Sequence, residues 1–116
     1  MPFLRRLPAA LLLALPLLSA TPAAIAAAAP PYPEAVRGAR KAADAVLHRA
    51  GREACLRGKL TRALLGLSSS CEASGQRNSL CSFADRAVVV TPMTLSFMDS
   101  TARELLQLTA PQPAAP

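Results

Sequence analysis

The sequence lacks most of the residue patterns on which catalysis depends. Among its 116 residues it has no tryptophan, one tyrosine and one histidine. Nucleophilic catalysis needs a nucleophile held beside a base and an orienting group. His48 is the only histidine, and on its own it does not indicate such a site. Paired carboxylates, a phosphate-binding glycine loop and a dinucleotide-binding glycine turn are missing from the sequence as well. We therefore expect a protein that is not an enzyme and uses no cofactor.

Metal ligands are also sparse. The chain has three cysteines, Cys55, Cys71 and Cys81, and no two of them form a C-x-x-C pair. Structural zinc sites combine such pairs with further cysteines or clustered histidines, which this sequence does not contain. We predict no metal site.

The N-terminal segment has the pattern of a secretory signal. Two arginines precede an apolar run over 7–20, and small residues at 24 and 26 match a cleavage site. The run is shorter than the about 20 apolar residues that cross a membrane, which argues against a retained anchor. We predict that residues 1–26 are a cleaved signal peptide, with cleavage after Ala28 as the alternative, and that the protein is exported, either periplasmic or secreted.

Cleavage changes the composition of the chain. The net charge falls from +6 to +4, because two of the 13 Lys and Arg residues are removed and all seven Asp and Glu residues stay. Leu, Val and Phe make up 18 of the remaining 90 residues, and alanine makes up another 18. Alanine favours helix but buries little apolar area, so we expect a marginally stable domain that benefits from a covalent crosslink.

Proline marks the limits of the folded body. Residues 27–33 form a Pro/Ala-rich linker and residues 110–116 a Pro/Ala tail that we expect to be disordered, since neither carries large apolar side chains. The small helical domain then spans 34–109.

The apolar pattern predicts helices throughout this domain. From 34 to 67 the chain has no proline and much alanine, which predicts one helix that is continuous or bent at Gly51 rather than broken by a turn. We expect Gly66 to end it and a loop to follow over 68–76.

Two further helices are predicted in the C-terminal half. The first starts at Asn78 or Ser79, and the second starts at Thr91, followed by Pro92, and runs to about residue 109. The fold class is therefore all-α, with three or four helices. The alternative is an α+β fold with a short hairpin around 87–98, because three successive valines favour a strand.

The cysteines of an exported chain predict a disulfide. Cys71–Cys81 is the favoured pairing, with Cys55–Cys81 as the alternative. The favoured bridge would leave Cys55 as a free thiol next to basic residues, where a cation stabilises the thiolate. A thiol-redox or disulfide-tethered role for Cys55 follows as one functional hypothesis.

The main functional signal is a basic segment. Residues 37–62 hold eight Lys and Arg residues against two acids, which leaves the rest of the mature chain at −2. On a continuous helix a polar stripe shares one face; it consists of Arg37, Lys41, Asp44, His48, Arg52, Cys55, Lys59 and Arg62.

The leading hypothesis is a binding or structural protein that uses this basic face, whose cations are Arg37, Lys41, Arg52, Lys59 and Arg62. An acidic protein, an envelope polymer or an anionic membrane surface would be attracted to it. Nucleic acid is not expected as a partner, because the segment has no aromatic residue on which a base could stack.

Overall fold

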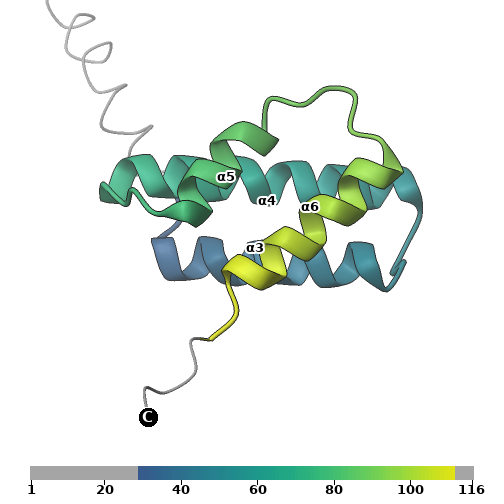
Figure 1. The fold of residues 1–116 in the computed structure, drawn as a ribbon, viewed down its shortest axis with the longest axis horizontal. Helices are drawn as coiled ribbons and strands as arrows, with labels where there is room; N and C mark the ends of the chain where they lie inside the picture. Colours follow the sequence, from purple (N-terminus) through teal and green to yellow (C-terminus); the bar gives the residue numbers. More distant parts are fainter. Residues whose placement is uncertain (1–28, 112–116) are drawn as a thin grey trace, which may run out of the picture.

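The computed structural model describes residues 29–111, so the predicted signal peptide and residues 112–116 of the predicted tail lie outside the described residues. Its elements are α3 (Tyr32–Leu47), α4 (Glu53–Ser74), α5 (Ser79–Ala87) and α6 (Leu95–Leu108) (Figure 1). The described residues contain no strand. The all-α prediction is therefore confirmed, and the alternative with a hairpin around 87–98 is wrong.

The four helices form two layers. Helices α3 and α4 lie side by side as a hairpin, with α5 packed on α4 and α6 packed across α3 (Figure 1). Leucines spaced three or four residues apart supply the α4 side of the core, which α3 faces with alanines and one valine. The fully buried members of these two stripes are Ala39, Ala43, Val46, Leu56, Leu60, Leu64 and Leu67. Small side chains on α3 let the hairpin pack closely around the leucines.

Helix α3 begins two residues inside the predicted linker, at Tyr32. Pro33 stands in its first turn, where the missing amide proton has no intrahelical acceptor and costs nothing.

A turn interrupts the helix that was predicted to continue through Gly51. The chain leaves α3 after Leu47, and both Arg49 (φ 51°) and Gly51 (φ 135°) have positive φ. A φ of 135° strains any L side chain, so glycine is required at this point in the turn. The continuous-helix prediction is wrong because the apolar stripe shifts by one residue here, and the chain buries both halves by folding back instead of bending.

Helix α4 ends later than predicted. It passes Gly66 and the expected loop over 68–76 and stops at Ser74, where Gly75 adopts a left-handed conformation with φ 72°. The Gln76 amide then donates to the Cys71 carbonyl at 3.0 Å, which closes the helix end. Gly66 did not end the helix because Leu67 and Cys71, one and five residues further on, are buried in the core.

The two remaining helix starts had different outcomes. Asn78 caps α5 as predicted, since its side-chain oxygen accepts the Cys81 amide at 2.9 Å. The predicted start of α6 at Thr91 and Pro92 is wrong, because Thr94 is the cap and accepts the Phe97 amide at 3.1 Å.

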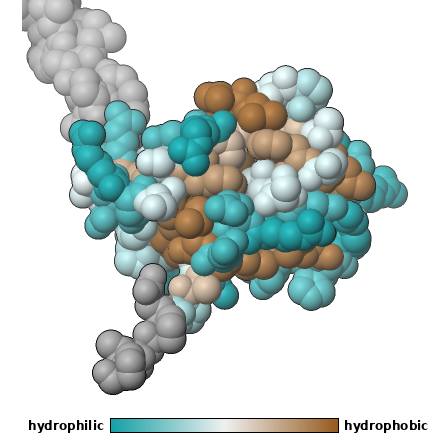
Figure 2. Space-filling view, viewed as in Figure 1, coloured by the Kyte–Doolittle hydropathy of each residue, from teal (hydrophilic) through white to brown (hydrophobic). Residues whose placement is uncertain are grey.

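The loop between α5 and α6 exposes apolar side chains. Val89 is 75% exposed and Val90 37% exposed, and hydrophobic atoms gather over the end of α5 and this loop (Figure 2). Met93, at the other end of the loop, is buried, and its carbonyl accepts a hydrogen bond from Arg57 Nε at 2.7 Å. This bond to α4 holds the loop in a position from which α6 can start.

Two arginines of the first layer tie α6 to the hairpin. Arg40 donates to the Thr109 carbonyl at 2.7 Å and so satisfies the C-terminal end of α6. In the turn, Arg49 makes a two-pronged ion pair with Asp99, with N to O distances of 2.6 and 2.8 Å.

This ion pair makes stability depend on pH. The hydrogen bonds from Arg49 hold the pKa of Asp99 below its ordinary value. Because protonation is harder in the folded state, the contribution is present above about pH 4 and is lost as the pH falls through the lowered pKa. Replacing Asp99 by Asn is expected to make the loss of stability below about pH 4 less steep, measured by urea unfolding at several pH values.

The Arg49→Gln variant provides the control for this prediction. It leaves the carboxylate without its partner, so it should give the same shallow acid profile as Asp99→Asn. A wild-type slope in both variants would contradict a role for the pair.

Candidate functional site

The hairpin brings the basic residues of the sequence together in a way that a single helix would not. Because the chain reverses in the turn, α3 and α4 lie side by side (Figure 1). Basic residues of both helices then line the same stretch of surface. A groove runs between them and encloses about 340 Å³. Its lining comes from these two helices alone, and consists of Gly38, Lys41, Ala42, Ala45, Lys59, Arg62 and Ala63.

The lining residues fall into two kinds. Glycine and alanine supply four of them, and the other three are cations: Lys41 from α3, and Lys59 and Arg62 from α4. All three cations are exposed, while Ala42 is only 7% exposed. The groove therefore has a small, apolar floor between cationic rims, with no acidic or aromatic residue in its lining.

Three of the five predicted basic-face residues thus meet at the groove, from opposite sides of the hairpin. The other two do not line it: Arg37 lies on the exposed side of α3, and Arg52 stands in the turn directly before α4. The interpretation as one continuous helical face is wrong, because the face is divided between two helices. Sequence reasoning missed Gly38, Ala42, Ala45 and Ala63, which join the site only once the chain has folded back.

The ion pairs of the described residues lie elsewhere. Arg49 pairs with Asp99, and Arg57 pairs with Glu53 one turn earlier on α4 at 2.8 Å. Both pairs use arginines outside the groove, and neither includes Lys41, Lys59 or Arg62. These three rim cations can therefore act on an anion from outside.

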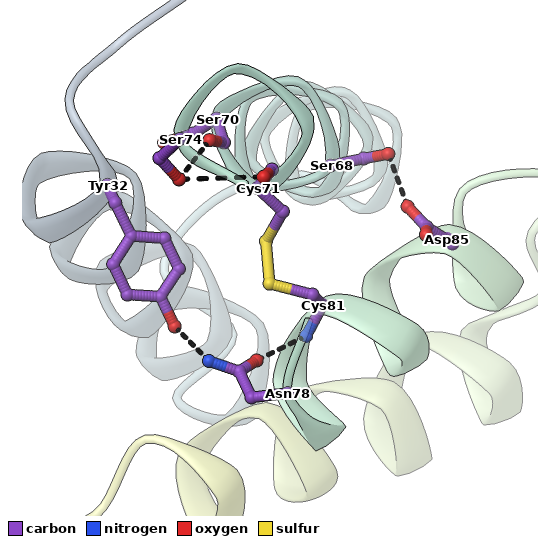
Figure 3. Close-up of a disulfide and its surroundings, with 8 residues drawn as sticks. All are labelled: Tyr32, Ser68, Ser70, Cys71, Ser74, Asn78, Cys81 and Asp85. Atoms are coloured by element: carbon purple, nitrogen blue, oxygen red, sulfur yellow. Dashed lines mark hydrogen bonds between the residues drawn. A yellow bond between two sulfur atoms is a disulfide. The ribbon is translucent and has the colours of Figure 1, made fainter. Parts of the chain in front are cut away.

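A second cavity of about 340 Å³ lies beside the disulfide, between the end of α4 and α5. Cys71 and Cys81 are joined with their Cα atoms 5.9 Å apart, which is the pairing that the sequence favoured over Cys55–Cys81 (Figure 3). Nearby, Ser68 donates to Asp85 at 2.6 Å across the same two helices.

The disulfide sits in a small polar network. The Asn78 side chain caps α5 with its oxygen and donates from its nitrogen to the Tyr32 hydroxyl at 2.8 Å, so three helices meet here (Figure 3). Both bridged cysteines are 4% exposed. A bridge this buried holds α5 against α4 and is poorly placed for exchange with an external thiol.

Cys55 and His48 are on the surface and outside both cavities. Cys55 is unbridged and exposed in the first turn of α4. His48 stands at the end of α3, with Nδ1 2.8 Å from the Asp44 carbonyl oxygen. Neither side chain lines the groove, and the ring contact of His48 is to its own helix.

Within residues 29–111, none of the helices combines the length and apolar character of a membrane span. In the same part of the chain, no three His, Cys, Asp or Glu side chains are grouped closely enough to hold a metal ion. Comparison with protein-family models, curated proteins and solved structures gave no significant match. The function is therefore inferred from the residues of this chain.

Proposed function

We propose that the mature protein is an exported, disulfide-stabilised binding protein that holds an anionic partner on the basic groove between α3 and α4. One observation carries the proposal: Lys41, Lys59 and Arg62 come from two helices to the rims of one groove, and no acid shares its lining. Cations gathered in this way raise the local concentration of an anionic partner and speed its association.

Two further features support export and a role without catalysis. The signal pattern over 1–26 directs a chain out of the cytosol, and a structural disulfide such as Cys71–Cys81 persists in oxidising compartments. The groove holds no nucleophile beside a base, which favours binding over chemistry.

The proposal is tested with a soluble polyanion. We expect dextran sulfate to bind the mature protein at low salt and to be released as salt rises, because screening weakens contacts between exposed charges. Reversing two rim charges in Lys59→Glu/Arg62→Glu should weaken binding by about tenfold or more, measured by titration calorimetry.

The matched control reverses two charges outside the groove. Arg77 and Arg86 are exposed in the other layer, before and within α5. The Arg77→Glu/Arg86→Glu variant has the same net charge as the groove variant and should retain most of the binding. Equal weakening in the two variants would mean that net charge, and not the groove, attracts the polyanion.

A covalent role for Cys55 is the second candidate, supported by its being exposed and unbridged. Rapid alkylation at neutral pH, or a disulfide-linked dimer on a non-reducing gel that Cys55→Ser removes, would favour it. A monomer whose Cys55 resists alkylation would contradict it.

A further inference from the structure

The groove lies on the side of the hairpin that the second layer leaves uncovered. Helices α5 and α6 pack on α4 and α3, yet neither contributes a residue to the groove lining. The hairpin is long enough for extended contact, since α3 has 16 residues and α4 has 22. At 1.5 Å per residue these helices offer a surface about 24 Å or more in length.

The floor of the groove allows another backbone to approach closely. A Cβ atom added at Gly38 would meet no atom within 4 Å, so the space above α3 is open at this position. The other floor residues are Ala42, Ala45 and Ala63, whose side chains end at a single methyl group. Small residues at a contact bring helix axes to the short end of the usual 8–10 Å separation.

The rims specify where the partner's charges must lie. Lys41 approaches from α3, whereas Lys59 and Arg62 are one turn apart along α4. Carboxylates three or four residues apart on a helix lie on one face with a similar spacing. A helix lying along the groove could therefore place acids over both rims and small apolar residues on the floor.

We propose that this groove binds an acidic amphipathic helix of a partner protein, with a stripe of alanine-sized residues facing the floor and Asp or Glu on both flanks. The inference rests on the proposed function and names its partner class. A third helix would extend the α3–α4 layer and pair the rim cations with carboxylates.

Other anionic partners match fewer of these features. A membrane surface is bound best by a basic face that also carries large apolar side chains for insertion, and the lining has none. A flexible polyanion makes use of the cations but not of the recessed apolar floor.

The test compares two peptides of identical composition. One is a helix-forming peptide with an alanine stripe flanked by glutamates, and the other has the same residues in scrambled order. The Gly38→Leu variant fills the groove without changing charge, and the open space at Gly38 lets the variant keep the fold. Gln107→Leu, at an exposed position on α6, is the matched control.

We expect the striped peptide to bind the wild-type protein more tightly than the scrambled one. Gly38→Leu should weaken that binding by about tenfold or more, because a filled floor keeps the helix out. It should weaken dextran sulfate binding by a much smaller factor, because a flexible polyanion contacts mainly the rim cations. Gln107→Leu should bind both probes as the wild type does. Circular dichroism of both variants checks that they keep their helices.

Four results would overturn this proposal. The two peptides could bind equally well, or Gly38→Leu could leave binding of the striped peptide unchanged. Gly38→Leu could also weaken binding of the peptide and of dextran sulfate equally, or the protein could bind phosphatidylglycerol–phosphatidylcholine vesicles and not the striped peptide. Dextran sulfate binding that depends on Lys59 and Arg62, with no peptide binding, would reject the helical partner and keep the proposed function. Absence of binding to any anionic probe would reject both.

Discussion

Replacing Cys71 and Cys81 together by alanine is expected to destabilise the protein by about 3 kcal/mol. The bridge closes a loop of 11 residues. A crosslink across a loop of that length lowers the conformational entropy of the unfolded chain, which stabilises the folded state by roughly 3 kcal/mol. A shift of this size lowers the melting temperature of so small a domain by about 10–20 °C. Thermal unfolding followed by circular dichroism measures it.

Helix α5 is expected to respond first. It has nine residues, and isolated helices shorter than about 12–15 residues are marginal in water. Without the bridge, its attachment depends on a small apolar face and on two side-chain hydrogen bonds, Ser68 to Asp85 and Asn78 to Tyr32. Amide exchange in the doubly substituted protein should therefore accelerate most strongly in α5, at temperatures where α3 and α4 are still protected.

Cys55→Ser is the matched control for this experiment. Cys55 is exposed and unbridged, so the change should alter the melting temperature by a few degrees at most. Should the double variant fail to fold, reducing the wild-type protein while it is unfolded and refolding it in the presence of the reductant provides the same comparison. A melting temperature that does not respond to either treatment would show that the bridge contributes nothing to stability.

The parts of the fold that could be predicted are those with local causes. Alanine-rich segments without proline form helices, and the side chain of Asn78 caps α5, because both effects act within one turn of the chain. The favoured disulfide is also local, as it joins residues ten apart.

The errors lie where tertiary packing outweighs local preference. Gly51 could be accommodated in a helix at a cost of about 1 kcal/mol, yet burying the apolar stripes of both α3 and α4 against one core stabilises the turn instead. Gly66 was predicted to end the helix because glycine is common directly after a helix C-terminus. Helix α4 continues past it because Leu67, the next residue, and Cys71, about one turn later, are both buried in the core.

The candidate site shows the same division. The basic residues Lys41, Lys59 and Arg62 could be predicted as part of a basic face, because the charge of a segment follows directly from its sequence. The groove between them depends on the hairpin, which sets residues some twenty positions apart side by side. Gly38 and the floor alanines carried no signal of their own, because glycine and alanine in a helix are equally consistent with solvent exposure.

Leu64→Ala is expected to cost about 3–5 kcal/mol, which is a large part of the stability of a domain with so few large apolar residues. Leu64 is 0% exposed, and it lies in the middle of the leucine stripe that the whole core packs around. Removing its branched end leaves a cavity that neighbouring alanines are too small to fill. Urea unfolding should show a lower midpoint or no folded baseline at all.

The adjacent residue supplies the control. Leu65 is 51% exposed on the same helix, so Leu65→Ala removes the same atoms and changes helix propensity equally, but it should cost less than about 1 kcal/mol. If the two variants unfold at the same urea concentration, the leucine stripe of α4 does not face the core. That result would also remove the basis for the groove, because rotating α4 to expose Leu64 would turn Lys59 and Arg62 away from Lys41.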